Sequence, residues 1–430
     1  MKKVIISTLS AIALLSSTLT ANAQVSSENT VQTSHAINTI NSADSVATLP
    51  QTTGVYQVGT TTFDWLDTSR EELLTPDPKD YRELMVQAWY PIDSGIGKET
   101  APYIPLTSEG IEKMAASVGL GKAFAEVNKI NTQVFENGEL SNQKTKYPVV
   151  LFSHGLGQGN WNYQWLTREL ASHGYVVFSV EHTGFSSGTE FTNGQFVPIT
   201  PKFLTGIPTL KEFDDAVDQI WVKDLQFVIR QVETLNQTDI KFNFKDRLDV
   251  NRMAAIGHSM GGAAAARALQ VEPKIKSAID IDGSLMGLTG ETAKMTKPFA
   301  VISNEFNSKV FKGEVEQPLP PGLDEKIVQD MKDSFKVFSN RYTQAIAGPA
   351  YDITIAGGAT HVSFTDMPLL KQYLIETPYF NILPTGIEPQ HIYDLSNRVI
   401  LSFLEKTLDG KNNTILDRKD FITPDLTIVQ

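Results

Sequence analysis

The segment Gly257-His258-Ser259-Met260-Gly261 constrains the fold of this 430-residue chain more than any other feature. A short apolar run, Arg252 to Gly257, leads into it, and an alanine-rich run typical of a helix follows it. This order of strand, sharp turn and helix is typical of a nucleophile elbow, in which a serine stands exposed at a strand end. Glycines two positions before and after Ser259 let the strand and helix backbones approach closely. We therefore predict that Ser259 is a nucleophile at the carboxyl end of a sheet.

Short apolar runs separated by helical patterns predict the rest of the architecture. The predicted strands are Tyr56–Trp65, Leu84–Tyr90, Pro148–Ser153, Tyr175–Val180, Arg252–Gly257, Ile275–Ile281, Pro298–Ser303 and Tyr351–Ile355. The clearest helical stripe comprises Val217, Trp221, Leu225, Val228, Val232 and Leu235. Strands that alternate with helices are typical of a parallel sheet covered on both faces. We predict an α/β-hydrolase fold with a mostly parallel central sheet and insertions at its carboxyl edge.

The N-terminal segment has the pattern of an export signal. Lys2 and Lys3 precede an apolar and hydroxyl-rich run, and Ala21-Asn22-Ala23 supplies the small residues of a cleavage site. We predict a signal peptide over residues 1–23, and hence a periplasmic or secreted protein. Residues 24–53 are rich in Ser, Thr and Asn, which predicts a disordered linker. The catalytic domain is then expected over residues 54–430.

Composition narrows the chemistry further. The formal net charge of −12 argues against nucleic acid as a partner. The chain has no cysteine, so neither a disulfide nor a thiol nucleophile is available. No zinc, calcium or dinucleotide signature appears, and we expect no metal and no cofactor. The sequence does not determine the oligomeric state.

A serine nucleophile needs a general base, and His361 is the strongest candidate. It follows the predicted strand Tyr351–Ile355 through a glycine-containing loop, and it lies after Ser259 in the order that such hydrolases use. Five other histidines have simpler explanations. His35 lies in the linker, His258 is turned away by the elbow, His173 and His391 fall in predicted helices, and His154 is expected to brace a loop.

The acid that orients the base has three candidates. Asp280 and Asp282 share one face of a strand, and Asp282 is the nearer to the edge where Ser259 is expected. Glu305 follows the next predicted strand. A carboxylate at a strand end is often only a turn residue, so the pattern of residues leaves the choice open.

A set of short motifs follows in order along the chain: Phe152-Ser-His-Gly-Leu-Gly157, Leu170-Ala-Ser-His-Gly-Tyr175, Glu181-His182, Gly257-His-Ser-Met-Gly-Gly262, Ile279-Asp-Ile-Asp282, Ser303-Asn-Glu305, His361, Phe364-Thr-Asp366, Tyr393-Asp-Leu-Ser-Asn397 and Phe403-Leu-Glu405. This ordered set resembles the plasma-type platelet-activating factor acetylhydrolases, the family of lipoprotein-associated phospholipases. The resemblance implies Asp282 as the triad acid and Asp280 as a structural neighbour. It departs from the family at Gly283-Ser284, where Ala-Trp is usual, and this leaves the shape of the pocket open.

An oxyanion hole requires two amide donors. The elbow geometry nominates the amide of Met260, directly after the nucleophile. The resemblance nominates the amide of Leu156, in the loop after the strand Pro148–Ser153. Trp161 and Trp165 lie just beyond this loop and are candidate pocket walls, although simple coverage of the sheet explains each equally well.

Two insertions are expected to shape access to the site. Residues 183–213 are predicted to form pocket walls and a partial lid. Near Ile111, Met114, Ala115 and Val118, the resemblance implies a helix that contacts a lipid surface, while packing onto the enzyme's own core explains the pattern equally well.

These features together predict a serine esterase that removes short or oxidised sn-2 acyl groups from phospholipids, with Ser259, His361 and Asp282 as its triad. A first alternative is a broad carboxylesterase or a cutinase-like polyester hydrolase, for which Glu305 would be the acid. A second alternative is an inactive binding protein that keeps the fold.

Overall fold

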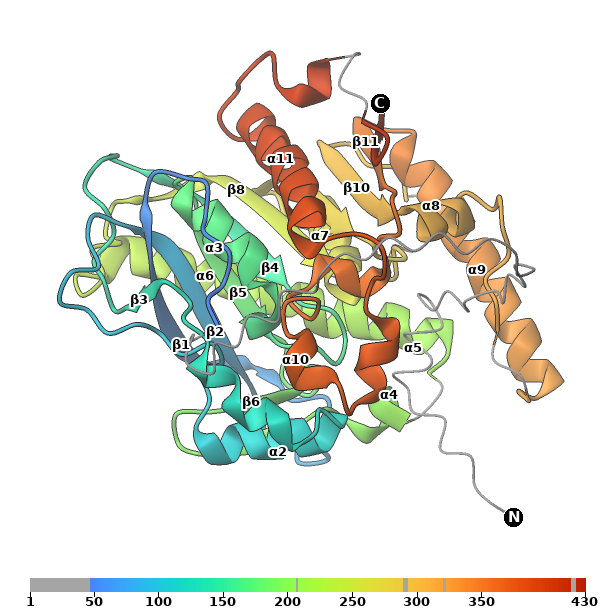
Figure 1. Ribbon diagram of the computed structural model, residues 1–430, viewed down its shortest axis with the longest axis horizontal. Helices are drawn as coiled ribbons and strands as arrows, with labels where there is room; N and C mark the ends of the chain where they lie inside the picture. Colours follow the sequence, from blue (N-terminus) through green and yellow to red (C-terminus); the bar gives the residue numbers. More distant parts are fainter. Residues whose placement is uncertain (1–46, 206–207, 289–292, 320–321, 419–422) are drawn as a thin grey trace, which may run out of the picture.

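The computed structural model describes residues 47–205, 208–288, 293–319, 322–418 and 423–430 (Figure 1). Their strands form a ten-stranded sheet in the order β12-β11-β10-β9-β8-β4-β5-β2-β1-β3, beside a two-stranded β6-β7 hairpin. The run from β5 through β4, β8, β9 and β10 to β11 is parallel throughout. Strand β2 pairs antiparallel with β5 and with β1, and β12 pairs antiparallel with β11. The predicted mostly parallel sheet is confirmed.

All eight predicted strands are present. The strands are β1 (Gln57–Glu71), β2 (Tyr81–Ile92), β3 (Val134–Glu136), β4 (Tyr147–Ser153), β5 (Val176–Glu181), β6 (Gly188–Glu190), β7 (Phe196–Pro198), β8 (Leu248–His258), β9 (Ile275–Ile281), β10 (Phe299–Asn304), β11 (Ala350–Ile355) and β12 (Leu426–Val429). The short strands β3, β6, β7 and β12 were not predicted, because three or four residues carry too little periodic pattern to be distinguished from a loop.

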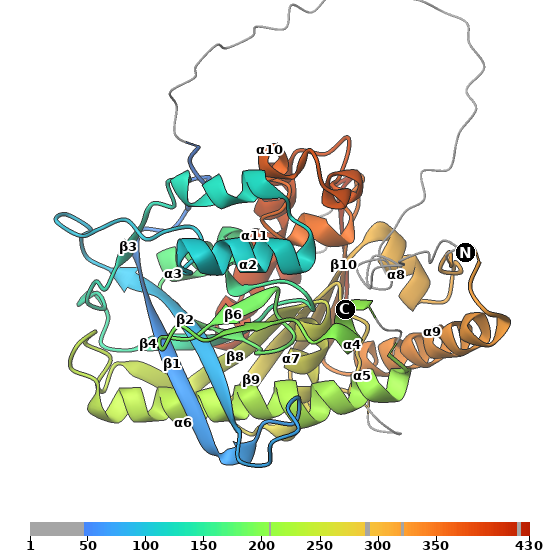
Figure 2. The ribbon, with the colours of Figure 1, turned by 90° about the horizontal axis from the view of Figure 1, so that it is seen from below.

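Helices cover both faces of the sheet (Figure 2). The α-helices are α2 (Ser108–Val118), α3 (Gln164–Ser172), α4 (Pro201–Thr205), α5 (Leu210–Ala216), α6 (Val222–Thr238), α7 (Met260–Val271), α8 (Glu305–Phe311), α9 (Glu325–Ile346), α10 (Lys371–Leu374) and α11 (Pro389–Thr407). The 3₁₀ segments are η1 (Lys122–Lys129), η2 (Asn160–Tyr163), η5 (His361–Phe364), η6 (Pro378–Ile382) and η7 (Ile415–Asp417), and η3 (Val217–Trp221) is a π-helical turn.

The two faces of the sheet bury separate cores. Helices α3 and α11 pack on one face, where Leu166, Leu170 and Phe403 are fully buried. Helices α6 and α7 pack on the other face. The predicted stripe from Val217 is confirmed there, since all its residues are buried except Leu235, which is partly buried. The sheet is therefore enclosed, and its carboxyl edge remains the place where loops meet.

The predicted start of the domain at Gly54 is too late. Leu49 is buried, and its amide donates to the carbonyl of Asn131. The amide of Thr53 donates to the carboxylate of Glu169 on α3 at 2.9 Å. The last part of the predicted linker, residues 47–53, therefore packs on the domain, because Leu49 supplies the apolar anchor that the Ser- and Thr-rich composition obscured. The signal peptide and the rest of the linker lie outside the described residues.

The two insertions lie over the carboxyl edge. Residues 183–213 contain the β6-β7 hairpin, α4 and the first turn of α5, with Phe185 and Phe203 buried among them. On α2 the apolar residues Ile111, Met114 and Val118 face the protein and are buried, which decides in favour of core packing for this stripe. Within the described residues, no helix combines the length and apolarity needed to cross a membrane.

Candidate active site

The turn at Ser259 has the strained backbone of a nucleophile elbow. Ser259 has φ 57° and ψ −122°, a conformation that L-residues rarely adopt. A Cβ on Gly257 would lie 2.1 Å from the carbonyl oxygen of Gly261, and a Cβ on Gly261 would lie 2.2 Å from that of Ser153. Both positions therefore exclude any side chain, as predicted for glycines that flank an elbow. The turn leaves Ser259 between β8 and the first turn of α7.

His361 and Asp282 form a buried pair at the same edge. The Nδ1 atom of His361 lies 2.7 Å from Oδ2 of Asp282, although 79 residues separate the two in the sequence. Asp282 directly follows β9 and His361 begins η5. The backbone amide of Ser259 donates to the carbonyl of Ile281 at 2.8 Å, which holds the elbow against the residue before Asp282. The structure thus joins His361 to Asp282 by a hydrogen bond and holds the elbow of Ser259 against the strand that precedes Asp282.

Two asparagines that the sequence analysis missed hold the Asp282 carboxylate in place. The backbone amide of Asn304 donates to Oδ1 of Asp282 at 3.0 Å. The side-chain amides of Asn304 and Asn307 donate to Oδ2 at 2.8 and 2.7 Å. With His361 these donors satisfy both carboxylate oxygens. Asn304 lies in the motif Ser303-Asn-Glu305, which was considered only for its carboxylate, and Asn307 lies two residues beyond it.

The other two candidate acids have different surroundings. Asp280 is buried, and its Oδ1 atom accepts from the amide of Gly283 at 2.9 Å. Burial raises the pKa of Asp280 well above its usual value, which favours the neutral form. Glu305 is exposed on α8 and pairs with Lys309 at 2.8 Å. The hydrogen bond to the His361 ring is therefore made by Asp282 and not by Glu305.

The loop predicted to supply an oxyanion donor, residues 154–157, which we call the oxyanion loop, follows β4 and lies against the elbow. A Cβ on Gly155 would be 3.3 Å from Cβ of Ser259. Among the described residues, neither the amide of Leu156 nor the amide of Met260 has a hydrogen-bond partner. Both amides are therefore free to donate to an oxygen held near Ser259, as an oxyanion hole requires.

His154 braces this loop, as expected. Its Nδ1–H donates to the carbonyl of Gly155 at 2.7 Å, and its Nε2 accepts from the amide of His182 at 3.0 Å. Burial lowers the pKa of His154 to about 3, so the ring is neutral and both nitrogens are already used. A role as a second base is therefore not open to it.

A buried charged cluster forms around His182, the residue whose amide donates to His154. His182 Nδ1 lies 2.9 Å from Oδ2 of Asp224, and the guanidinium of Arg82 donates to both oxygens of that carboxylate at 3.1 and 2.8 Å. Burial alone would raise the pKa of Asp224, but the charge of Arg82 outweighs it and holds that pKa far below its usual value. Glu72 also accepts from Arg82 at 2.8 Å. No local pattern in the sequence indicates this cluster, because Arg82 and Asp224 lie on β2 and α6, whereas Glu72 and His182 directly follow β1 and β5.

The remaining histidines have structural partners. His173 ends α3 and lies 3.1 Å from Glu169, and His391 on α11 lies 3.0 Å from Asp425. His35 lies outside the described residues. His258 is buried, and its contacts are considered below.

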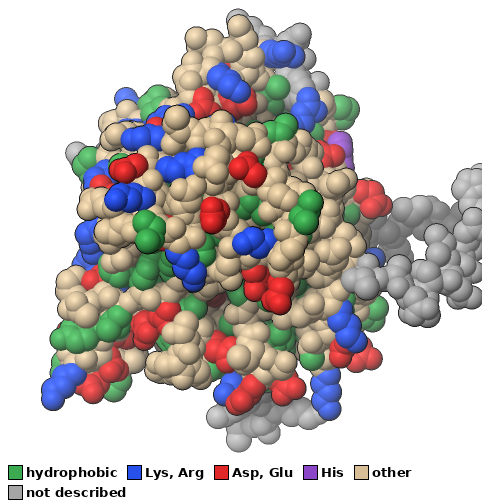
Figure 3. Space-filling model, turned by 90° about the vertical axis from the view of Figure 1, so that its left-hand side faces the viewer, with side chains coloured by type: hydrophobic (Ala, Val, Ile, Leu, Met, Phe, Trp, Pro, Cys, Tyr) green, Lys and Arg blue, Asp and Glu red, His purple; other side chains and the backbone are tan. Residues whose placement is uncertain are grey.

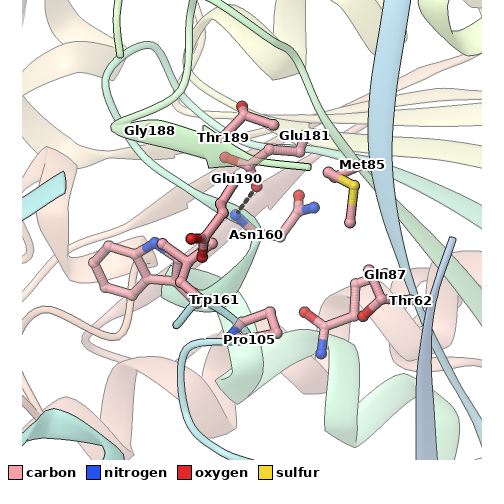
Figure 4. Close-up of a pocket in the computed structure, with 11 residues that line it drawn as sticks. Thr62, Met85, Gln87, Pro105, Asn160, Trp161, Glu181, Gly188, Thr189 and Glu190 are labelled. Carbon is pink, nitrogen blue, oxygen red and sulfur yellow. Dashed lines mark hydrogen bonds between the residues drawn. The ribbon is translucent and has the colours of Figure 1, made fainter. Parts of the chain in front are cut away.

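Trp161 and Trp165 lie in different surroundings. Trp161 borders a hollow of about 30 Å³ together with Met85, Gln87 and Glu181 (Figure 4). It also borders a second, tighter and mostly apolar hollow between the oxyanion loop and α10, of about 10 Å³. Trp165 instead stacks on Tyr393 and donates from its indole to the carbonyl of Phe364 at 3.0 Å. Trp165 thus packs in the core beneath α11, whereas Trp161 is a pocket wall.

Glu181, which borders the same hollow as Trp161, was not singled out as a pocket residue in the sequence. Figure 4 shows it joined to Asn160, whose amide donates to Oε2 at 2.9 Å. Its Oε1 atom is buried and has no hydrogen-bond partner among the described residues. Burial raises the pKa of Glu181 to about 7. A strand-end Glu-His pair was visible in the sequence, but the burial of its carboxylate was not.

Comparisons with known proteins show the family of this chain. The family model of platelet-activating factor acetylhydrolase, isoform II, matches residues 41–198 and 211–420. Platelet-activating factor acetylhydrolase of Canis lupus familiaris is 27% identical over 282 residues, covering 61% of this chain and 57% of that protein. A probable 1-alkyl-2-acetylglycerophosphocholine esterase of Arthroderma benhamiae is 25% identical over 249 residues, covering 56% of this chain and 59% of that protein.

A solved structure shares the fold. The ferulic acid esterase from Streptomyces cinnamoneus superposes with a TM-score of 0.67 at 21% identity, covering 90% of this chain and 100% of that chain. Such a likeness supports the predicted α/β-hydrolase architecture. Because the family model matches nearly the whole of the catalytic domain, this chain belongs to the platelet-activating factor acetylhydrolase isoform II family.

Proposed function

We propose that this protein is a serine esterase that hydrolyses short or oxidised sn-2 acyl esters of phospholipids. The observation that carries the proposal is the buried His361–Asp282 hydrogen bond of 2.7 Å beside the strained elbow of Ser259. A serine hydroxyl becomes nucleophilic when a base removes its proton, and the base must be held in the correct tautomer. Asp282 accepts from Nδ1 of His361, which leaves Nε2 to take that proton.

In the proposed mechanism Ser259 attacks the ester carbonyl, and His361 takes the proton and returns it to the leaving alcohol. The amides of Leu156 and Met260 stabilise the oxyanion, and water then releases the acyl group from Ser259. Removal of one such donor typically costs about 100-fold to 1,000-fold in turnover. No metal or cofactor is needed for any of these steps.

Family membership and the shape of the site support the choice of substrate. A small, mostly apolar hollow bordered by Leu120, Phe124 and Leu374 lies beside the oxyanion loop. A restricted apolar space of this kind supports a short acyl group over a long one. A lipid surface would be met by residues other than the apolar stripe of α2, since that stripe is buried.

The test compares three substrates: a platelet-activating factor analogue, a long-chain phospholipid and a simple butyrate ester. We expect the first to be hydrolysed much faster than the second. Equal rates on all three would favour a broad carboxylesterase, and hydrolysis of the butyrate ester alone would favour the cutinase-like alternative.

The Ser259→Ala variant tests the mechanism itself. It should remove turnover without loss of folding, because Ser259 is small and its hydroxyl makes no packing contact on which the fold depends. A fluorophosphonate should label Ser259 and no other serine. Hydrolysis by the variant would contradict the mechanism, and a wild-type protein that hydrolyses no ester would support an inactive binding protein.

Export is proposed on the N-terminal pattern alone. If residues 1–23 are a signal peptide, N-terminal sequencing of the protein recovered outside the cytoplasm should begin at Gln24. A protein that begins at Met1 would contradict the proposal.

A further inference from the structure

His258, between Gly257 and the nucleophile, makes two contacts that the proposed mechanism does not use. It is buried at 2% exposure, and its Nε2 lies 3.1 Å from the backbone carbonyl oxygen of His361. Its Nδ1 lies 2.9 Å from the hydroxyl of Tyr163 on η2. The rings of His258 and His361 lie with centroids 4.4 Å apart. His258 therefore contacts the base and a segment beyond the oxyanion loop at the same time.

The direction of each hydrogen bond follows from the groups involved. A carbonyl can only accept, so Nε2 of His258 carries the hydrogen and its Nδ1 is an acceptor. The Tyr163 hydroxyl must then donate to Nδ1, which leaves its oxygen to accept from the amide of Gly155 at 2.8 Å. The bonds form one consistent chain from Gly155 through Tyr163 and His258 to His361.

This chain stays intact during the proposed reaction. Burial, followed by the nearby His361, lowers the pKa of His258 well below its usual value. Burial likewise raises the pKa of Tyr163 far above its usual value. Both groups are thus neutral when His361 becomes positively charged, and His258 does not compete with it for the proton.

The groups of this hydrogen-bonded chain are also closely packed around Gly155. A Cβ on Gly155 would lie 3.1 Å from Nδ1 of His258 and 3.1 Å from the hydroxyl of Tyr163. The loop that carries the Leu156 amide is thus held by its neighbour Gly155 on one side. On the other side, the hydrogen bond from His258 to the carbonyl of His361 holds the start of η5.

We propose that Tyr163 and His258 are positioning residues that hold the oxyanion loop and His361 in register with Ser259. The proposal rests on the proposed esterase function. It extends that function by assigning a role to the second residue of the Gly-His-Ser-Met-Gly motif. Neither residue touches the reacting atoms in this role: Tyr163 acts through the backbone of Gly155, the neighbour of Leu156, and His258 acts through the backbone of His361.

The variant Tyr163→Phe removes the central hydroxyl and keeps the ring. It leaves the Gly155 amide and Nδ1 of His258 without partners, so the loop can shift. We expect kcat on a p-nitrophenyl ester to fall by about 10-fold to 100-fold, less than for loss of an oxyanion donor, with KM changed by less than about twofold. The rate of Ser259 labelling by a fluorophosphonate should fall by the same factor.

Tyr393→Phe is the matched control. Tyr393 is likewise buried, with 2% exposure. Its hydroxyl donates to the carbonyl of Thr365 at 2.8 Å, a bond that is not part of the hydrogen-bonded chain from Gly155 to His361. The melting temperature of this variant should fall by about as much as that of Tyr163→Phe. Its kcat and its labelling rate should stay at the wild-type values. The proposal is wrong if Tyr163→Phe keeps both rates within about twofold of wild type, or if the two variants lose them equally.

A double-variant comparison tests the coupling. His258→Gln should slow labelling, and His258→Gln combined with Tyr163→Phe should be little slower than the worse single variant, because both changes break one chain. If the two single losses of labelling rate instead multiply in the double variant, the result would contradict the proposal. If the wild type is labelled at Ser259 but hydrolyses none of the three substrates, the proposed substrate fails, while the labelling ratios still decide the positioning role.

Discussion

Three non-glycine residues near the site adopt positive φ angles, which residues with a Cβ atom rarely do. Ser259 has φ 57°, Asp282 has φ 55° and Leu285 has φ 55°. Each such residue costs of the order of 1–3 kcal/mol, and the surrounding structure must hold it there. Ser259 and Asp282 both lie directly after parallel strands, so the unusual angles turn two strand ends toward one point. The strain coincides with the residues proposed for catalysis.

The first prediction at the residue scale concerns Asp282. The variant Asp282→Asn cannot accept from Nδ1 of His361 as the carboxylate does, and it should favour the wrong imidazole tautomer. Turnover should fall by about 10,000-fold, the magnitude known for a triad that keeps its geometry and loses its tautomer. The measurement is kcat on a p-nitrophenyl ester.

Glu305→Gln is the matched control, because Glu305 is exposed and pairs with Lys309. This variant should keep wild-type turnover. A large loss for Glu305→Gln together with a small loss for Asp282→Asn would reverse the assignment of the acid.

The second prediction concerns the pH dependence of Glu181. Burial raises its pKa from 4.5 to about 7, so the folded state binds this proton more tightly than the unfolded state does. This contribution to stability is fully present below about pH 4.5 and is lost as the pH rises through 7. Glu181→Gln removes the ionisation. Its free energy of unfolding relative to wild type should therefore increase between pH 5 and pH 8.5, by up to about 3 kcal/mol.

Urea unfolding of both proteins at the two pH values measures this change. Comparison at each pH cancels the titration of all other groups. A difference between variant and wild type that stays constant with pH would show that Glu181 does not titrate in this range.

At the scale of elements, the site depends on how closely β8 and α7 meet. Gly257 is the residue before last of β8, and a Cβ there would overlap the backbone of α7 at Gly261. Backbone atoms cannot rotate out of the way as a side chain can. The elbow is therefore fixed by two elements that must touch, and not by the turn alone.

The variant Gly257→Ala tests this contact. It should lower the free energy of unfolding by about 3 kcal/mol and reduce turnover, because α7 must move away from β8. Gly194→Ala is the control: Gly194 has φ 85°, and a Cβ there meets nothing within 4 Å. It should cost about 1 kcal/mol of backbone strain and leave turnover unchanged. Equal effects of the two variants would show that the overlap is relieved cheaply.

At the scale of the whole molecule, the surface seen in Figure 3 carries acidic and basic side chains side by side, with hydrophobic ones scattered among them. The long apolar surfaces are used internally, on the two faces of the sheet. The domain extends to residues 47–53, which reach α3 and the segment before β3. These residues form part of the folded body.

The boundary leads to a prediction about truncation. A chain that begins at Gly54 should be less stable than one that begins at Ala47 by about 2–4 kcal/mol, since it loses the burial of Leu49. Urea unfolding of the two chains measures the difference. Leu49→Ala in the longer chain should reproduce most of the loss. Equal stabilities would show that residues 47–53 are a linker after all.

Much of this protein was visible in its sequence. The eight main strands and the helix stripe from Val217 were correctly predicted, because burial imposes a periodic pattern on long elements. The elbow was visible because Gly257 and Gly261 are required by local sterics. The packing of Trp165 against Tyr393 was not visible, since no local pattern distinguishes a pocket aromatic from a core one.

The sequence by itself determined what local geometry dictates: an elbow at Ser259, a parallel sheet beneath it and a histidine, the proposed base, in the loop after β11. Only the tertiary structure decided which groups meet across long separations. It joined His361 to Asp282, placed Asn304 and Asn307 on the same carboxylate, and linked Gly155 to His361 through Tyr163 and His258. The physical reason is that a hydrogen bond depends on distances of about 3 Å, and such distances are set by the packing of whole elements.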